Sequence, residues 1–122
     1  MDGGFESGIY DNENSNTILL LGDKDIKPSY DYDNGIAAQT ILLGAVEKGM
    51  GGCMIASVQR ARLRAALNIP ERYEILLVLA LGKPIETVMI EAVQADGDIK
   101  YWRDSQGRHH VPKRSLADVI IN

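Results

Sequence analysis

The apolar residues of this chain fall into a few runs, and two of them are short and continuous. Residues 17–22 (TILLLG) and residues 73–82 (YEILLVLALG) each end at a glycine. Continuous apolar runs of this length are typical of strands that are buried within a sheet. We therefore expect two buried strands, with residues 73–82 forming the central strand, covered on both faces.

A third apolar region has the spacing of a helix. In residues 34–48 the apolar side chains cover almost the whole helical circumference, which predicts a helix buried on nearly all sides. In a chain this small, a second copy of the chain would have to bury part of that surface. Asp33 is the expected N-cap, Lys48 suits the last turn, and Gly49 suits a left-handed C-cap.

The remaining segments alternate between short helical and extended patterns. Ser57 is expected to cap a helix over residues 58–67, which ends before Pro70. Residues 83–93 read as extended. Residues 98–114 predict a hairpin around the turn sequence DSQG, and residues 115–122 a short helix or tail. The mixture predicts an α+β fold, with residues 1–16 as a flexible N-terminal arm and residues 17–122 as one domain.

Composition narrows the classes of protein that this chain can belong to. Its 122 residues suit a single domain, and a hydrophobic fraction of 45% suits a globular core. A net charge of −4 argues against general binding to nucleic acid. The sequence shows neither a signal peptide nor a membrane-spanning run. One cysteine excludes an internal disulfide and fits a cytoplasmic protein.

Three glycines in four positions precede the only cysteine, in the stretch EKGMGGCMIAS. A cysteine nucleophile needs a nearby base, and the two histidines lie far along the chain, so a buried, inert Cys53 is favoured. A dinucleotide fingerprint is excluded because a third glycine and a preceding strand are missing. Two interpretations stay open: an ordinary helix-to-strand turn, or a backbone strip over residues 53–57 that faces a planar ligand.

The hairpin carries the other candidate side chains. His109 and His110 are adjacent on an expected strand and so point to opposite faces, which favours a surface pair over a metal site. One of Tyr101 and Trp102 is expected to face the core or a partner subunit. Lys113 and Arg114 follow a proline and suit a ligand phosphate, although a solvated basic pair is the commoner case.

A dense set of these motifs resembles the nitroreductase family of FMN-dependent oxidoreductases. They are the apolar helix that ends in KGMGG, the strip CMIAS, the arginine-rich segment QRARLRAALNIP, the strand that ends in LALGKP, and the closing segment VPKRSLADVII. The resemblance extends over residues 17–122 and corresponds to the C-terminal two thirds of the family. It implies a small sheet flanked by helices, without the family's usual N-terminal helices.

The resemblance also implies a cofactor, partners and site residues. The cofactor would be FMN, held at the interface of a homodimer, with NAD(P)H as electron donor and a nitroaromatic, quinone or similar acceptor. Residues that would contact FMN are Gly51, Gly52, Met54, Ile55, Ala56 and Ser57 after the helix, with Lys113 and Arg114 at the phosphate. No catalytic acid, base or metal ligand is expected, because the flavin carries the chemistry. The alternative is a truncated, flavin-free member that serves dimerisation or binds a small ligand.

Overall fold

The computed structural model describes residues 16–121 and divides the chain into two compact units. The first runs to Pro84 and the second begins at Ile85. The sequence predicts one domain over residues 17–122. The boundary between the two units falls just after the strand β3 (Tyr73–Gly82), at Pro84. Within the described residues, no strand after Pro84 pairs with the sheet that contains β3. The expected N-terminal arm lies outside those residues, except that Asn16 already belongs to a strand.

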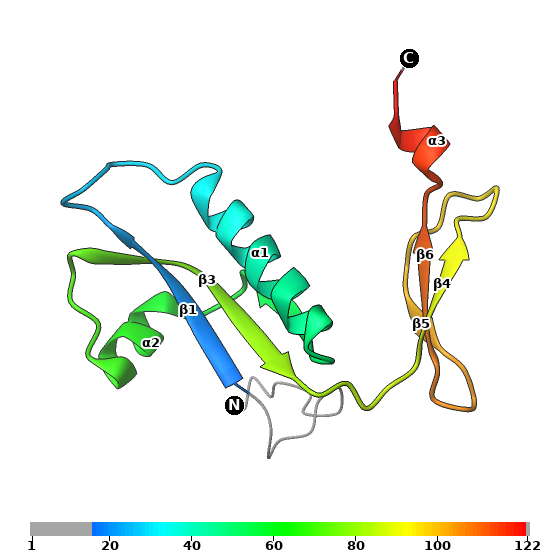
Figure 1. Ribbon diagram of the computed structural model, residues 1–122, viewed down its shortest axis with the longest axis horizontal. Helices are drawn as coiled ribbons and strands as arrows, with labels where there is room; N and C mark the ends of the chain where they lie inside the picture. Colours follow the sequence, from blue (N-terminus) through cyan, green and yellow to red (C-terminus); the bar gives the residue numbers. More distant parts are fainter. Residues whose placement is uncertain (1–15, 122) are drawn as a thin grey trace. The chain divides into compact units, whose positions relative to one another are not determined.

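The first unit contains a three-stranded antiparallel sheet (Figure 1). Its strands are β1 (Asn16–Asp23), β3 (Tyr73–Gly82) and β2 (Gly51–Ile55), in the order β1-β3-β2. The central position of β3 is confirmed. The long apolar run suits this position because its side chains meet neighbours on both sides, as Leu79 does opposite Ile18 and Met54.

One face of this sheet forms the core of the unit. Helix α1 (Asp33–Glu47) packs on that face, and its Ala38 is fully buried against Leu77 and Leu79 of β3. Partly buried Ile18, Leu20 and Ile41 surround this cluster. The opposite face is less covered, since Leu76 and Ala80 are only half-buried. The expectation that β3 is fully covered on both faces is therefore wrong within one copy of the chain.

The helix α1 differs from its prediction at its start and on its surface. Tyr32 is the N-cap and makes no side-chain hydrogen bond, while Asp33 is already helical and pairs with Lys27 at 2.6 Å. Only Ala38 and Ala45 are buried, so a single chain does not provide the expected burial on nearly all sides. The large side chains that remain more than half exposed on this helix are Ile36, Leu43 and Val46.

The end of α1 is a well-formed C-terminal cap, and Gly49 is confirmed there. Gly49 has φ +75 and donates its N–H to the Val46 carbonyl, while Met50 donates to the Ala45 carbonyl. These two bonds are the Schellman arrangement, in which a left-handed residue closes the last carbonyls of a helix. Lys48 is the C-cap residue rather than part of the last turn.

The second helix, α2 (Arg60–Leu67), begins later than predicted. Gln59 is its N-cap, and Ser57 does not cap it. The helix ends at Asn68 in the left-handed conformation, which asparagine tolerates better than most residues. Two arginines join it to the surrounding backbone: Arg60 Nε donates to the Ile75 carbonyl at 2.8 Å, and Arg64 donates to the Pro70 and Tyr73 carbonyls, both at 2.7 Å.

The second unit contains a sheet of three short strands. They are β4 (Val88–Ala92), β6 (His109–Lys113) and β5 (Trp102–Arg103), in the order β4-β6-β5. β5 and β6 form the predicted hairpin, with Gly107 at φ +75 in its turn. β4 and β6 are parallel over five residue pairs, whereas β5 covers only two residues of β6.

A short helix, α3 (Leu116–Val119), follows β6. Ser115 caps it: the Ser115 hydroxyl accepts the Asp118 N–H, and the Asp118 carboxylate accepts the Ser115 N–H. This reciprocal capping box explains why so short a helix forms. In the part of the chain described, no helix has both the length and the apolar character needed to cross a membrane.

Candidate functional site

The candidate strip after the glycines begins on strand β2. The helix-to-strand turn of this stretch lies at Gly49, and Gly51 and Gly52 are already in β2. β2 is an edge strand, because β3 pairs with one side of it and no described strand pairs with the other. The backbone N–H and C=O groups on that outer side are therefore available to a ligand.

The absent side chain of Gly52 has a structural explanation within the unit. A Cβ built on Gly52 would lie 2.5 Å from side-chain carbons of both Leu42 and Leu81, and 2.9 Å from the Ala80 carbonyl oxygen. Gly52 therefore allows α1 to approach the sheet closely. This supports the ordinary structural interpretation of this glycine and does not require a flavin.

The rest of the strip is accessible to a ligand. Met54 is 43% exposed, Ala56 and Ser57 are exposed, and Ile55 is half-buried. Strand pairing places Met54 opposite Leu79 on the face toward α1, and Ile55 opposite Val78 on the other face. After Ile55 the chain leaves the sheet, and Val58 donates its N–H to the Ala56 carbonyl at 3.0 Å. The strip thus offers backbone groups with small or flexible side chains.

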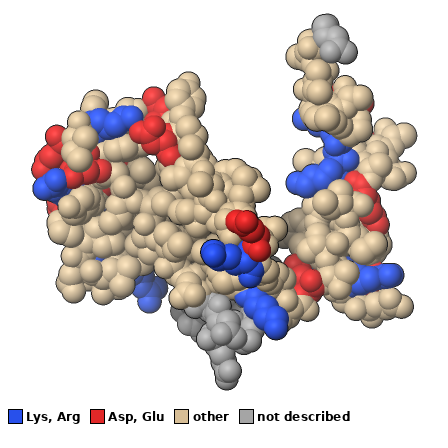
Figure 2. Space-filling model, viewed as in Figure 1, with Lys and Arg blue, Asp and Glu red and all other residues tan. Residues whose placement is uncertain are grey.

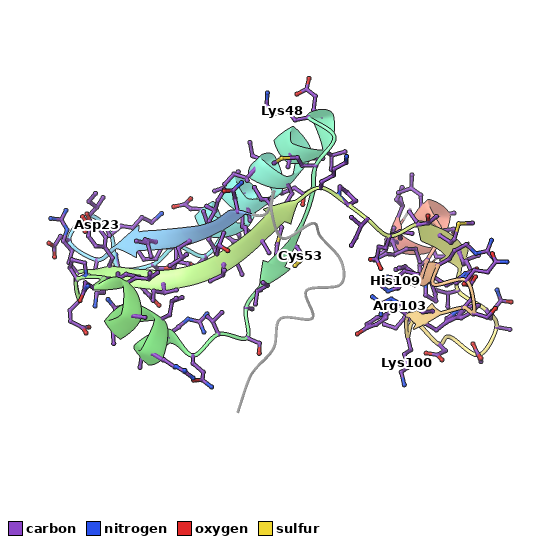
Figure 3. The ribbon with its side chains drawn as sticks, turned by 90° about the horizontal axis from the view of Figure 1, so that it is seen from below. Asp23, Lys48, Cys53, Lys100, Arg103 and His109 are labelled. Carbon is purple, nitrogen blue, oxygen red and sulfur yellow. The ribbon has the colours of Figure 1, made fainter. Side chains whose placement is uncertain are left out.

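Cys53 is exposed on β2, so the expectation of a buried thiol is wrong (Figure 3). Its cross-strand partner is Ala80, which places it on the less covered face of the sheet. Both histidines of the chain belong to the second unit, and the unit that carries Cys53 has none. The first unit alone therefore provides no histidine base for a cysteine nucleophile.

The predicted phosphate-binding cations lie in the second unit. Lys113 ends β6 opposite Ala92, and Arg114 follows it directly before the Ser115 cap. Both are exposed, and neither makes an ion pair within residues 16–121. The structure thus groups Gly51–Ser57 in one unit and Lys113–Arg114 in the other, and it leaves both cations free to bind an anion.

The two histidines are not the surface pair that the sequence predicts. His110 is only 7% exposed, and His109 is half-buried beside Glu86, which also binds Arg103. Figure 3 labels His109 and Arg103. Tyr101 packs edge-on against His109, and Trp102 stacks on His110. Strand alternation predicted that the side chains of His109 and His110 point in opposite directions. Their carboxylate partners, however, come from distant segments of the chain. Among residues 16–121, no group of three or more His, Cys, Asp or Glu side chains is arranged to hold a metal ion.

A comparison with known families bears directly on the first unit. The model of the nitroreductase family matches residues 16–83, more than half of the chain. The chain belongs to the nitroreductase family. The match coincides with the first unit and ends just before Pro84, so the family's conserved pattern is found in α1, α2 and the β1-β3-β2 sheet.

Two solved structures share this nitroreductase fold. One is an FMN-dependent nitroreductase from Clostridium difficile R20291, with a TM-score of 0.53 and 26% identity over 57% of this chain. The other is a nitroreductase family protein from Clostridium novyi NT, with a TM-score of 0.50 and 28% identity over 56% of this chain. The matches cover 46% and 42% of those proteins, so this chain spans less than half of their length.

Proposed function

We propose that this chain acts as an FMN-dependent oxidoreductase of the nitroreductase type. It would take electrons from NAD(P)H and pass them to a nitroaromatic, quinone or similar acceptor. The observation that carries the proposal is the outer edge of β2, with which no strand of residues 16–121 pairs and which lies in the segment that matches the family. The name of the Clostridium difficile protein, an FMN-dependent nitroreductase, supports the choice of cofactor.

The chemical character of the candidate residues suits FMN. The flavin ring needs hydrogen-bond donors and acceptors along a surface without bulky side chains, and residues Gly51–Ser57 offer both. The phosphate needs cations, and Lys113 and Arg114 are exposed and free of ion pairs in the described structure. When bound, FMN would accept hydride from the nicotinamide and deliver electrons to the acceptor. The residues of this chain bind and orient it.

The proposal includes a homodimer. The surface over α1 in Figure 2 is drawn mostly in tan, because the only charged residues of the helix are Asp33 and Glu47 at its two ends. Between them, Ile36, Leu43 and Val46 are each more than 60% exposed. A large apolar patch of this kind is typical of a protein interface. A second copy of the chain would bury it.

The test is the visible absorption spectrum of the purified protein, recorded before and after incubation with FMN and removal of the excess. A retained flavin spectrum, a sedimentation mass of two chains and oxidation of NAD(P)H when an acceptor is added are the expected results. A colourless protein that does not retain FMN would contradict the proposal.

Replacement of Arg114 by alanine should weaken FMN binding. The loss of a charge-assisted hydrogen bond costs about 1.5–3 kcal/mol, which corresponds to roughly a 10- to 150-fold higher Kd. Titration calorimetry with FMN measures this directly. Arg62→Ala is the control, since Arg62 is an exposed cation of α2 with no proposed role. Equal FMN affinities for wild type and Arg114→Ala would show that Arg114 does not bind the FMN phosphate.

The packing of Gly52 supports a second candidate function, a flavin-free dimerisation or small-ligand-binding module. Gly52 is explained by its contacts within the unit, with Leu42, Leu81 and the Ala80 carbonyl, so it would be retained in a chain that no longer binds flavin. A protein that sediments as a dimer but does not bind FMN would support this alternative over the oxidoreductase.

A further inference from the structure

His110 occupies an unusual position for a neutral histidine. The residue is 7% exposed, and each of its two ring nitrogens faces a carboxylate. Nδ1 contacts Glu91 of β4, and Nε2 lies 3.0 Å from Asp104 Oδ2, in the turn that follows β5. The ring therefore bridges a parallel neighbouring strand and the hairpin turn of its own sheet.

Only one protonation state satisfies both contacts. A neutral imidazole donates one hydrogen bond, so its second nitrogen would point a lone pair at a carboxylate. An imidazolium donates from both nitrogens. We propose that His110 is a proton-controlled latch: with two protons it ties β4 to the β5–β6 turn, and loss of one proton releases one of these contacts and loosens the small sheet.

Other groups around Asp104 keep its carboxylate ionised. Asp104 also accepts Arg108 Nε at 2.7 Å, and its Oδ1 accepts the backbone N–H groups of Gln106 and Arg108. The pKa of Asp104 is held well below its usual range, first by the hydrogen bond to His110 and then by Arg108. A separate group of the same unit is formed around Glu86, which contacts both His109 and Arg103.

The two carboxylates raise the pKa of His110, with the hydrogen bond to Asp104 as the larger cause and that to Glu91 next. The folded unit therefore holds the proton more tightly than the unfolded chain. Its contribution to stability is complete below the ordinary histidine pKa of 6.5 and is lost as the pH rises through the folded value. At acid pH, the contribution of Asp104 to the stability of the unit is complete above pH 3.8, the ordinary pKa of an aspartate. It declines as the pH falls through the lowered pKa of Asp104 in the folded chain.

The chain provides a built-in reporter for this latch. Trp102 is its only tryptophan, and its ring stacks on His110 with centroids 3.9 Å apart and planes 5° from parallel. A stacked imidazolium quenches indole emission more than a neutral imidazole does. Deprotonation of His110 should therefore raise the emission of Trp102, and this signal needs neither a flavin nor a substrate.

The experiment is a pH titration of the full chain, followed by Trp102 emission and by NMR of the two histidine rings. We expect His110 to titrate above pH 6.5 and the Trp102 emission to change with the same midpoint. The protection factor of the His109 amide, which is its exchange rate relative to the intrinsic rate at each pH, should fall at least tenfold above that midpoint. The His109 N–H reports the sheet itself, because it donates to the Thr87 carbonyl next to β4.

Two variants separate the latch from other causes. Glu91→Gln should lower the His110 midpoint by about 1 pH unit, because it removes one opposite charge but keeps a hydrogen-bond acceptor. His109→Gln should leave the Trp102 titration unchanged, and it also assigns the two NMR signals. The proposal is wrong if His110 titrates at or below pH 6.5 or if Glu91→Gln leaves its midpoint unchanged. It is also wrong if the protection factor of the His109 amide does not change with the titration of His110.

Discussion

Replacement of Leu79 by alanine is expected to destabilise the first unit by about 3 kcal/mol, within the 2–5 kcal/mol typical of a fully buried leucine. Leu79 has no exposed surface and lies in the core cluster with Ala38 and Leu77. It is also the cross-strand neighbour of Met54 on β2. The cavity would open beneath the candidate strip, so we expect the β2 amides to exchange faster as well.

Urea unfolding followed by far-UV circular dichroism measures this effect, because α1 and α2 both belong to the first unit. Leu67→Ala is the control, since Leu67 is 53% exposed and its truncation should cost less than about 1 kcal/mol. Equal losses for the two variants would show that Leu79 does not anchor the core.

Replacement of Gly52 by alanine should also be strongly destabilising, although it adds a single methyl group. The added carbon would lie 2.5 Å from Leu42 and Leu81, which can shift, and 2.9 Å from the Ala80 carbonyl, which belongs to the central strand and cannot. Overpacking of this kind costs about 1–3 kcal/mol. The expected result is a lower urea midpoint with an unchanged slope.

Gly44→Ala is the matched substitution, because it adds the same methyl group within α1. Outside its chain neighbours and the helix's own backbone, no atom lies within 4 Å of a Cβ at Gly44, and alanine is favoured over glycine in a helix interior by about 0.5–1 kcal/mol. The two variants should therefore change stability in opposite directions. Stabilisation of the chain by Gly52→Ala would refute the close approach of α1 to β2.

Local sequence patterns predicted the elements of the fold well. The apolar run over residues 73–82 predicted the central strand, and Gly49 predicted the C-terminal cap of α1. Both predictions succeeded because each depends only on residues that are neighbours along the chain. The hairpin over residues 98–114 followed from its turn sequence. The parallel pairing of β4 with β6 was not predictable, since residues about twenty positions apart carry no shared local signal.

The errors arose where burial depends on distant contacts. An all-round apolar helix predicts burial, but the single chain covers only one side of α1, and Ile36, Leu43 and Val46 stay exposed. Cys53 was expected inside because cysteine usually is, yet it lies on an edge strand. The sequence patterns predicted no structural role for the arginines of α2. In the structure, Arg60 and Arg64 donate hydrogen bonds to backbone carbonyls of β3.

The candidate site was only partly visible in the sequence. Of the strip over residues 53–57, only residues 53–55 lie in the strand β2, and residues 56 and 57 follow it outside the sheet. The position of the strip at the edge of the sheet came from the pairing of β2 with β3 alone. The histidines were placed on opposite faces, but Glu86 and Glu91 lie 23 and 19 residues from their partners. Only the folded chain shows that these imidazoles are held by carboxylates.

The short span of β5 has a consequence for how the small sheet meets other molecules. β5 covers only His109 and His110 of β6, and beyond them no strand of the described residues pairs with the outer side of β6. The His109 N–H points toward β4, and strand alternation therefore turns the nitrogen of Pro112 toward the open side. A strand from another molecule would need a donor there, and proline has none. Pro112 thus protects this edge from strand-to-strand aggregation.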